Sequence, residues 1–346
     1  MPERQATRRH VVCCGLTTLD VVQHVDHVPG PDEKVVARDL WVAAGGPAAN
    51  AAVTAAALGA RATLVTRIGD GPVADLVRAD LRAHGVEVHD LAGPGATPAV
   101  STVLVTTSTG ERAVVSVNAT GRPDVTADGG VATTDLPDGV ARTLAACDAL
   151  LVDGHHLDLA LAAARRARDA GAPVLLDGGS WKPGLERLLA VVDVAVLSAA
   201  FRAPAALPAP GGPDDDAAPS RQARDPDGAG LLRAVRRAGP RLVARSQGGG
   251  PIQVLADDDP VDGRLLEVRV PEVPVRDTLG AGDVLHGAAL AWLAQRPATR
   301  PLDAPALADG LARAAEVASW SCRTDGARGW LADHDAVGRL AAHVRG

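Results

Sequence analysis

Short apolar runs alternate with alanine-rich stretches along most of the chain. The apolar runs are rich in leucine and β-branched residues and predict strands, whereas the alanine-rich stretches have helical period. Strands separated by helices are joined by crossover connections, so we predict an α/β fold whose mostly parallel sheet is covered by helices on both faces. The predicted strands are 11–14, 63–68, 150–153, 174–177, 194–197 and 242–245, and the predicted helices are 48–58, 73–84, 158–170, 231–238, 281–294 and 304–320.

Two regions break this alternation, because extended segments follow one another without a helix between them. Segments 20–25 and 35–42 flank a turn with the sequence VPGPDE, and segments 100–106 and 112–117 flank the turn STGE at 108–111. Four such strands would form a small separate sheet that projects from the main one. A projecting sheet beside a substrate cleft is a common form of lid.

The domain organisation follows from these patterns. A chain of 346 residues is of ordinary length for a single α/β domain. We predict one domain over residues 1–346, with the lid strands inserted at about 18–43 and 99–118. Residues 203–230 are rich in Pro, Ala, Gly and Asp without an apolar period, which is typical of a flexible surface insertion.

Composition narrows the range of functions. Apolar residues make up 47% and charged residues 22% of the chain, as in globular proteins with a large core. The formal net charge of −7 offers no overall positive field for nucleic acid or anionic lipid, and 2% aromatic residues are too few for base stacking. Neither Lys34 nor Lys182 follows a glycine-rich loop, and the chain has no other lysine, which excludes a P-loop nucleotide site.

The cellular compartment is predicted from the number of cysteines and from the lengths of the apolar and uncharged runs. Four cysteines are too few for a disulfide-stabilised scaffold of this length. The first apolar run, 11–15, is shorter than the apolar part of a secretory signal. The longest uncharged run, 43–60, contains Pro47, Asn50 and Thr54 and is mostly Ala and Gly. We therefore expect a soluble, cytoplasmic protein without a membrane partner.

The strongest chemical signal is the string DTLGAGD at 277–283, directly before a stretch of helical period. Its Gly280, Ala281 and Gly282 would lie at a helix N-terminus, where backbone N–H groups lack partners and the helix dipole adds roughly half a positive charge. Small side chains leave these N–H groups open to a ligand. The string therefore predicts an anion site suited to a phosphate during its transfer.

Asp283 would lie in the first turn of the same helix, beside the anion site. A carboxylate next to a phosphoryl group can accept the proton of an attacking hydroxyl. The alternative for a lone Gly-x-Gly-Asp is an aspartate that only caps the helix. The complete string before a helix favours the catalytic role.

A second signal is GGPAAN at 45–50, which opens a predicted helix. Gly45 and Gly46 permit close backbone approach to a ligand, and Asn50 presents both a donor and an acceptor. Asp20, after the first strand, is a carboxylate that can accept two sugar hydroxyls. The plainer interpretations are a turn with a helix cap for the glycines and asparagine, and a turn aspartate for Asp20.

With GG–Asn early and DTxGAGD late, the chain resembles the ribokinase (PfkB) family of carbohydrate kinases over nearly its whole length. The resemblance implies a ribokinase-like three-layer sandwich, with a mostly parallel central sheet and a small projecting β-sheet lid. It also implies ATP-dependent phosphorylation of a sugar hydroxyl, with the amides of Gly280, Ala281 and Gly282 as anion hole and Asp283 as catalytic base. The residues that it implies for sugar binding are Asp20, Gly45, Gly46 and Asn50.

Within the family, the stretches at 14–33, 71–88 and 107–116 are similar to ketohexokinases in residue types and in spacing. This similarity implies that Asp32 reaches a sugar site, in a neighbouring subunit of a homodimer formed through the lid. It also implies that Arg112 contacts the transferred phosphate, since a guanidinium suits phosphate; a solvated hairpin residue is the alternative. Because proline at position 47 replaces an expected asparagine donor, the similarity indicates a ketose or similar small sugar without specifying fructose.

The resemblance also implies ATP, Mg²⁺ and a K⁺ site near Asp277. Family members commonly carry Asn-x-x-Glu where 198–201 reads SAAF, so we expect Mg²⁺ to be held mainly by nucleotide phosphates and solvent. Lys182 follows a predicted strand and would contact a nucleotide phosphate, unless it is a plain surface lysine. The other predicted nucleotide-binding residues are Ser246, Gly248, Ala315, Ala318 and Cys322.

Two other functions stay open. A ribose or nucleoside kinase would use the same scaffold, although the chain has few aromatic residues on which a base could stack. A sugar- or nucleotide-binding sensor that has lost catalysis would explain the altered segments 198–201 and 246–247, although Asp283 and its glycines are intact. Release of ADP in the presence of different sugars distinguishes these functions.

Overall fold

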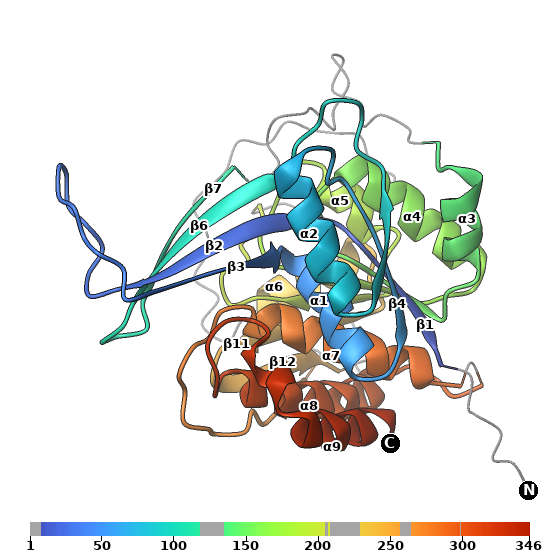
Figure 1. The fold of residues 1–346 in the computed structure, drawn as a ribbon. Coiled ribbons are helices and arrows are strands. Elements are labelled where there is room, and N and C mark those ends of the chain that lie inside the picture. Colours follow the sequence, from blue (N-terminus) through green and yellow to red (C-terminus); the bar gives the residue numbers. More distant parts are fainter. Residues whose placement is uncertain (1–7, 118–134, 205–206, 208–228, 257–263, 298) are drawn as a thin grey trace, which may run out of the picture.

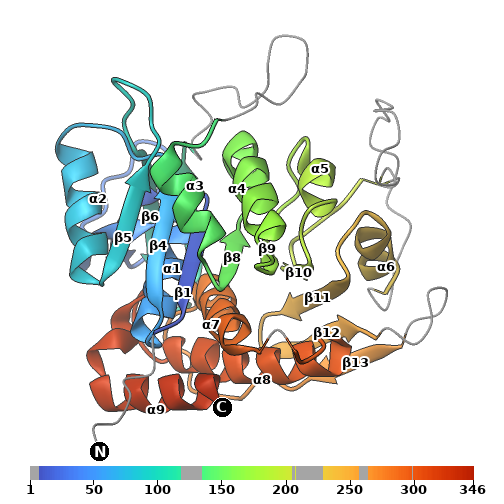
Figure 2. The same ribbon diagram turned by 90° about the vertical axis from the view of Figure 1, so that its right-hand side faces the viewer.

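The computed structural model describes residues 8–117, 135–204, 207, 229–256, 264–297 and 299–346. Within these residues the centre is a nine-stranded sheet with the strand order β13-β12-β11-β10-β9-β8-β1-β4-β5 (Figures 1 and 2). The strands are β1 (His10–Cys14), β4 (Arg61–Thr66), β5 (Val86–Asp90), β8 (Ala149–Val152), β9 (Val174–Gly178), β10 (Val194–Leu197), β11 (Leu242–Gln247), β12 (Gly250–Leu255) and β13 (Leu265–Val268).

The predicted parallel sheet is confirmed. From β5 across to β11 all neighbouring strands are parallel, whereas β12 and β13 pair antiparallel at one edge. Along β1, Val11 and Cys13 pack into one apolar cluster while Val12 and Cys14 pack into another. Because successive side chains of a strand point to opposite faces, a strand that is covered on both sides needs a continuous apolar run.

Helices cover both faces of the sheet. The first cluster includes buried residues of α1, α2, α7, α8 and α9, and the second includes buried residues of α3, α4, α5 and α6 (Figure 2). Among these helices of the described chain, none combines the length and the hydropathy that a bilayer crossing needs. The helices are α1 (Pro47–Ala57), α2 (Pro72–Ala83), α3 (Asp138–Ala145), α4 (Leu157–Asp169), α5 (Leu185–Leu189), α6 (Ala229–Arg237), α7 (Ala281–Gln295), α8 (Ala304–Ser321) and α9 (His334–Arg345), with the short 3₁₀ helix η1 (Gly329–Ala332).

The predicted small sheet is also present and projects to one side of the main sheet (Figure 1). It consists of β2 (Thr18–Val25), β3 (Asp39–Gly45), β6 (Ala99–Thr106) and β7 (Arg112–Ser116), in the order β3-β2-β6-β7. On its inner face, Val22 and Val103 pack with Leu279 of the loop before α7. This contact joins the small sheet, which we call the lid sheet, to the DTLGAGD string.

Several elements differ from those predicted. β3 begins at Asp39 and not at 35, because Val36 lies in the preceding loop, where its side chain is 80% exposed. Strands β5, β12 and β13 and helices α3, α5 and α9 were not predicted; they are short or lie outside the strand–helix alternation. Helix α6 begins at Ala229, inside the segment 203–230 that was predicted to be a flexible insertion, and most of the rest of that segment lies outside the described residues.

Candidate active site

The loop before α7 is held in place by Asp277. The Asp277 carboxylate accepts hydrogen bonds from the backbone N–H groups of Leu279 (2.8 Å) and Gly326 (2.8 Å). Gly280 caps α7 with a φ of 72°, and a Cβ at this residue would overlap the Ala327 side chain. Only glycine fits this position. The DTLGAGD loop is therefore a tight turn that is tied to the segment after α8.

The first turn of α7 presents open backbone donors. The N–H of Ala281 donates to the Thr278 carbonyl oxygen at 3.2 Å, which uses this amide within the turn. The N–H groups of Gly282 and Asp283 follow in the first helical turn, where the helix itself supplies no acceptor. Of the three predicted anion-hole amides, that of Ala281 is thus engaged within the turn, and the anion hole itself stays a prediction.

Helices α1 and α7 bring the early and the late motif into contact. Asn50 Nδ2 donates a hydrogen bond of 2.7 Å to Asp283 Oδ2, although the two residues are 233 positions apart. The close approach of the helices depends on Gly287, where a Cβ would lie 2.5 Å from the Ala51 carbonyl oxygen. Two motifs that were predicted separately thus form one site.

The environment of Asp283 shifts its protonation toward neutral pH. Burial raises the pKa of Asp283 to about 7, and the nearby Asp177 carboxylate, with a smaller contribution from Asp20, adds to the increase. The hydrogen bond from Asn50 and the neighbouring His286 act in the opposite direction. A carboxyl group with this pKa can accept a proton and release it again close to neutral pH, as a general base must.

One turn further along α7, His286 is buried beneath the site. Its Nδ1 lies 2.7 Å from the Gly282 carbonyl oxygen and 3.3 Å from Asp177 Oδ2, while its Nε2 lies 3.0 Å from the Val196 carbonyl oxygen. Both ring nitrogens therefore face acceptors, and the ring lies beside Asp177 under the first turn of α7.

A pocket of about 260 Å³ lies between the lid sheet and the segment after α8. Burial raises the pKa of Asp20 in this pocket, while the Thr18 hydroxyl donates to its carboxylate at 2.6 Å. A Cβ at Gly45, on the neighbouring strand, would overlap that carboxylate. The glycine therefore makes room for Asp20. The pocket walls include Asp20, Trp41, Asn50, Asp80, Leu279 and Arg328.

Two charged residues of this pocket were missed in the sequence. The Arg328 guanidinium donates from Nη1 to Asp80 Oδ2 and from Nη2 to Asn50 Oδ1, the latter at 3.1 Å. Asp80 also accepts the backbone N–H of Ala44 at 3.0 Å. Burial lowers the pKa of Arg328, and Asp80 opposes this effect. The two residues come from α2 and from the segment after α8, so no local pattern could have marked them.

A second pocket, of about 610 Å³, opens on the other side of the first turn of α7. Gly282, in the first turn of α7, and Arg112 both line it. The segment 270–273 forms another part of the wall and was not singled out, because it carries no recognisable motif. Five of the six predicted nucleotide-binding residues line the pocket: Ser246, Gly248, Ala315, Ala318 and Cys322.

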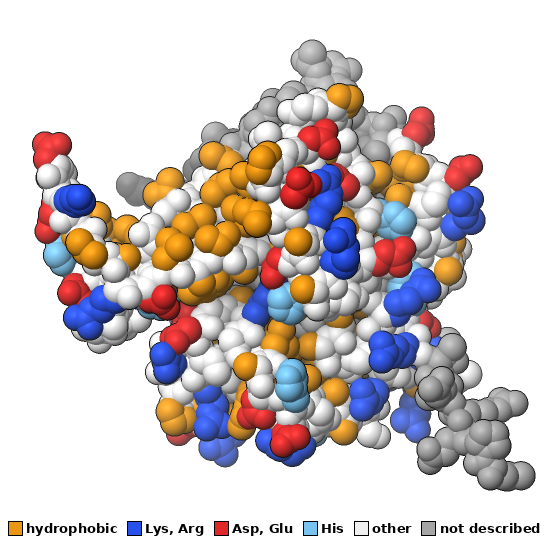
Figure 3. All heavy atoms as spheres, in the orientation of Figure 1, with side chains coloured by type: hydrophobic (Ala, Val, Ile, Leu, Met, Phe, Trp, Pro, Cys, Tyr) orange, Lys and Arg blue, Asp and Glu red, His pale blue; other side chains and the backbone are white. Residues whose placement is uncertain are grey.

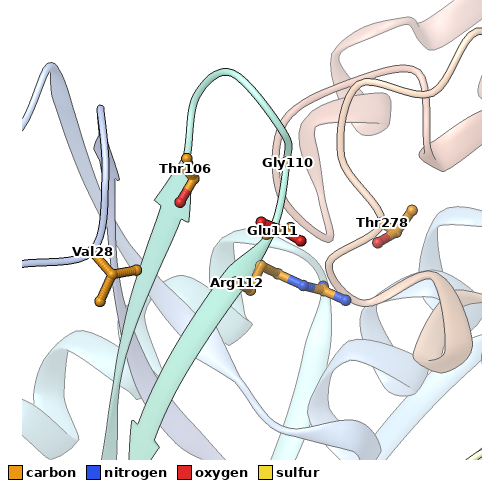
Figure 4. Close-up of a pocket in the computed structure, with 6 residues that line it drawn as sticks. All are labelled: Val28, Thr106, Gly110, Glu111, Arg112 and Thr278. Carbon is orange, nitrogen blue, oxygen red and sulfur yellow. The ribbon is translucent and has the colours of Figure 1, made fainter.

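A third, open cavity of about 620 Å³ lies under the β6–β7 hairpin and is lined in part by Thr106, Glu111, Arg112 and Thr278 (Figure 4). The Arg112 side chain extends from the start of β7 toward the loop that carries Thr278 (Figure 4). Arg112 and Thr278 line both this cavity and the second pocket. Arg112, at the start of the lid strand β7, thus lines both cavities together with Thr278, and its predicted contact to phosphate stays a prediction.

The remaining predicted residues lie apart from these pockets. Asp32 is exposed in the lid turn. Gly46 caps α1 with a φ of 95°, and a Cβ there would overlap the Leu16 carbonyl oxygen, so this glycine serves the turn. Lys182 does not line the second pocket; its Nζ donates to the Ser180 carbonyl oxygen at 3.3 Å, and burial lowers its pKa.

The side chains near the site limit how a metal ion could be bound. Across the described ranges, the structure has no group of three or more His, Cys, Asp or Glu side chains that could hold a metal ion. Mg²⁺ keeps several waters and is commonly bound by one or two carboxylates together with substrate phosphates, so this donor set fits Mg²⁺ that arrives with a nucleotide. The Asp277 carboxylate is engaged by two N–H groups, and its predicted K⁺ site stays a prediction.

A comparison with protein-family models assigns this chain to a family. The model of the pfkB family carbohydrate kinases matches residues 8–333, which includes the lid sheet, the Asn50 motif and the loop before α7. The chain belongs to this family. Its fold is accordingly the ribokinase-like sandwich that the sequence predicted.

Individual relatives of this pfkB-family chain agree with the family match. It is 34% identical over 122 residues to ketohexokinase from Mus musculus, which covers 34% of this chain and 40% of the ketohexokinase. It is 40% identical over 63 residues to ribokinase from Dictyostelium discoideum, which covers 18% of this chain and 20% of that protein. The aligned stretches thus span less than half of these curated relatives.

A solved structure extends the likeness to the whole fold. The structure of Arabidopsis thaliana ribokinase complexed with ribose and ATP matches with a TM-score of 0.68 at 17% identity, and the match covers 97% of this chain and 99% of that one. At this identity the likeness concerns the fold, including the small sheet beside the large one.

Proposed function

We propose that this pfkB-family chain is a carbohydrate kinase that transfers the γ-phosphate of ATP to a hydroxyl of a small sugar. The observation that carries the proposal is that Asp283 has one neighbouring residue in each of two pockets. On one side, its partner Asn50 lines the 260 Å³ pocket together with Asp20. On the other side, the adjacent Gly282 lines the 610 Å³ pocket. A base and an anion site therefore lie where a bound sugar and a bound nucleotide would meet.

The geometry supports a direct transfer. The Asp283 carboxylate accepts the hydroxyl proton as the hydroxyl oxygen forms its bond to the γ-phosphorus and the bond from that phosphorus to the β-phosphate oxygen breaks, which releases ADP. The amides of Gly282 and Asp283 and the helix dipole stabilise the negative charge of the transferred group. Mg²⁺ bound to the nucleotide would neutralise phosphate charge in addition.

The smaller pocket favours a single sugar ring. A volume of about 260 Å³ lies below the range of roughly 300–1,000 Å³ that is usual for drug-sized ligands. Its walls carry the carboxylates of Asp20 and Asp80 and the amide of Asn50, which suit hydroxyl groups, and Trp41 is its one aromatic wall among the described residues. We therefore favour a ketose or similar small sugar over a nucleoside, in keeping with the names of the relatives, ketohexokinase and ribokinase.

Release of ADP tests this function. The purified chain is incubated with ATP, Mg²⁺ and, separately, ketohexoses, ribose, other pentoses, and nucleosides, each with a no-acceptor control. We expect ADP release that depends on a ketose or similar small sugar, and a sugar phosphate as the second product. Turnover with nucleosides alone would favour the nucleoside kinase, and nucleotide binding without turnover on any acceptor would favour the sensor. Omission of K⁺ in the same assay tests the predicted cation site.

We also infer that a second copy of the chain packs on the lid sheet. The strand register places Val42, Val21 and Val115 in one row on its outer face, with Thr102 between the last two, opposite the face that carries Asp20. Val115 is 74% exposed and Val42 is 45% exposed. Figure 3 shows hydrophobic side chains gathered over this part of the molecule. A paired lid would also explain how Asp32, remote from the pockets of its own chain, reaches a sugar in the neighbouring one.

A further inference from the structure

Arg328 occupies a central position in the wall of the 260 Å³ pocket. It lies in the segment between α8 and η1, and its side chain is only 12% exposed. Its guanidinium donates from Nη1 to Asp80 on α2 and from Nη2 to Asn50 on α1. Asp80 is itself anchored, since it accepts the backbone N–H of Ala44 on the lid strand β3. Arg328 is therefore held by one partner while it contacts another.

The chemistry of these groups determines the orientation of the Asn50 amide. A guanidinium has only donors, so the amide atom that faces Arg328 must be the oxygen Oδ1. An ionised carboxylate has only acceptors, so the atom that faces Asp283 must be the nitrogen Nδ2. The distances of 3.1 Å to Arg328 and 2.7 Å to Asp283 satisfy both conditions at once. A flipped amide would lose both hydrogen bonds.

We propose that Arg328 is a positioning residue that acts on Asp283 through Asn50. By fixing the amide, it keeps Oδ2 of Asp283 engaged and leaves Oδ1 as the oxygen that receives the proton of the sugar hydroxyl. The proposal rests on the proposed function, in which Asp283 is the base. Without Arg328, the Asn50 amide is free to turn its oxygen toward Asp283, which would repel the ionised carboxylate.

The other charged groups around Asp283 come from three elements. Asp177 on β9 and Asp20 on β2 favour its protonated form, and His286 on α7 favours the ionised form. Asn50 donates the direct hydrogen bond that favours ionisation. Loss of that bond shifts the balance toward the protonated form, so we expect Asp283 to titrate at higher pH when Arg328 is replaced.

The test is a titration of Asp283 in the full chain, followed by ¹³C NMR of labelled aspartate carboxyls and assigned with Asp283→Asn. In Arg328→Met the Asp283 titration should shift upward by about one pH unit, the equivalent of one lost hydrogen bond. Arg328→Lys keeps a positive charge beside Asp80, but a lysine has no second NH₂ group with which to reach Asn50 as well. It should shift the titration in the same direction by a smaller amount, and it serves as the variant that folds if Arg328→Met does not.

Kinetics provide the second readout. We expect kcat for the sugar to fall in Arg328→Met, more strongly at pH 6 than at pH 8.5, with little change in the KM for ATP. The matched control is Arg78→Gln on α2, because Arg78 is also half-buried and pairs with Asp90, away from the pocket. It should lower the melting temperature and leave both the titration and the pH profile unchanged.

Two results would overturn the proposal. One is an Asp283 titration in both Arg328 variants that coincides with that of the wild type. The other is a higher KM for the sugar with an unchanged pH profile, which would make Arg328 a direct substrate contact. The NMR titration needs no turnover, so it tests the role of Arg328 even if no acceptor is phosphorylated. A failure to phosphorylate any acceptor would count against the proposed function and not against the role of Arg328.

Discussion

At the scale of single residues, the proposed base and its proposed stabilising groups share one helical turn. Asp283 shares this turn with the open amide of Gly282, and Asn50 holds one of its carboxylate oxygens. His286 is buried one turn below, where its Nδ1 lies 3.3 Å from Asp177 Oδ2. The same aspartate is thus destabilised in its ionised form by burial while the surrounding donors favour negative charge on a bound phosphate.

Replacement of the base gives the most direct residue-level prediction. In Asp283→Asn the side chain keeps its shape but can no longer accept the hydroxyl proton. We expect turnover to fall by roughly 10²–10⁴-fold, the usual contribution of a positioned general base. Sugar binding, measured by calorimetry in the absence of ATP, should persist because Asp20 and Asn50 are unchanged. Near-normal turnover in this variant would refute the assignment of Asp283.

The same substitution should change the pH dependence of stability. The pKa of Asp283 is about 7 in the folded chain against an ordinary value of 3.8. Between these values the native state binds more protons than the unfolded state, so stability falls as pH rises through this window. Asp283→Asn removes that loss. We expect its melting temperature to exceed that of the wild type at pH 8 but not at pH 4. A difference that does not depend on pH would contradict this expectation.

At the scale of elements, the contact between α1 and α7 places Asn50 beside Asp283. The contact surface is made of small residues, since α1 contributes mainly alanine and α7 contributes Gly287. At Gly287 a Cβ would lie 2.5 Å from the Ala51 carbonyl oxygen and 2.8 Å from Thr54 Cβ. Backbone atoms cannot rotate away, so the helices would have to separate.

A methyl group at this contact is therefore a test of the element packing. We expect Gly287→Ala to lower stability by about 1–3 kcal/mol, the usual cost of an overfilled core. Turnover should fall as well, because the Asn50 to Asp283 distance grows. The matched control is Gly338→Ala on α9, where the added Cβ meets no atom within 4 Å. It should raise stability by about 0.5–1 kcal/mol. Chemical denaturation measures both, and equal effects would contradict the packing argument.

At the scale of the whole molecule, the proposed active site lies between the lid sheet and the helices of the main sheet. The lid sheet supplies Asp20 and Trp41 to the smaller pocket, while α1 supplies Asn50, which is hydrogen-bonded to Asp283 on α7. A change in the angle between the sheets would open or close the smaller pocket around a sugar. Water excluded by such a closed pocket would not compete with the sugar as acceptor.

The outer face of the lid sheet leads to a prediction about assembly. A lysine at Val115 would place a charge among the apolar side chains that we expect a second copy to cover. Val115→Lys should therefore shift the sedimentation coefficient from that of a dimer to that of a monomer. Leu76→Lys on α2, where the leucine is 56% exposed, is the control and should not change the assembly. A monomeric wild-type chain would remove the basis for the paired lid.

The six predicted strands and six predicted helices, together with the small sheet, could be read from the sequence because their signals are local. A strand buried on both faces must be apolar throughout, and a helix start must lie just before its periodic stretch, as at Gly280. The roles proposed for Asp283 and Asn50 come from motifs of the same local kind. Strands such as β12 and β13 were not predicted, because they are short and follow one another at a sheet edge.

Contacts between distant segments could not be read in this way. Asp80, Arg328 and Asn50 form one hydrogen-bonded chain, although Arg328 is 248 positions from Asp80 and 278 positions from Asn50. The partners of the Ala281 amide and of the His286 ring likewise depend on which carbonyl oxygens lie near them after folding. Local pattern thus determines which elements form and which residues carry chemistry. The packing of those elements determines which partners each side chain meets, because pairing and burial arise only in the folded chain.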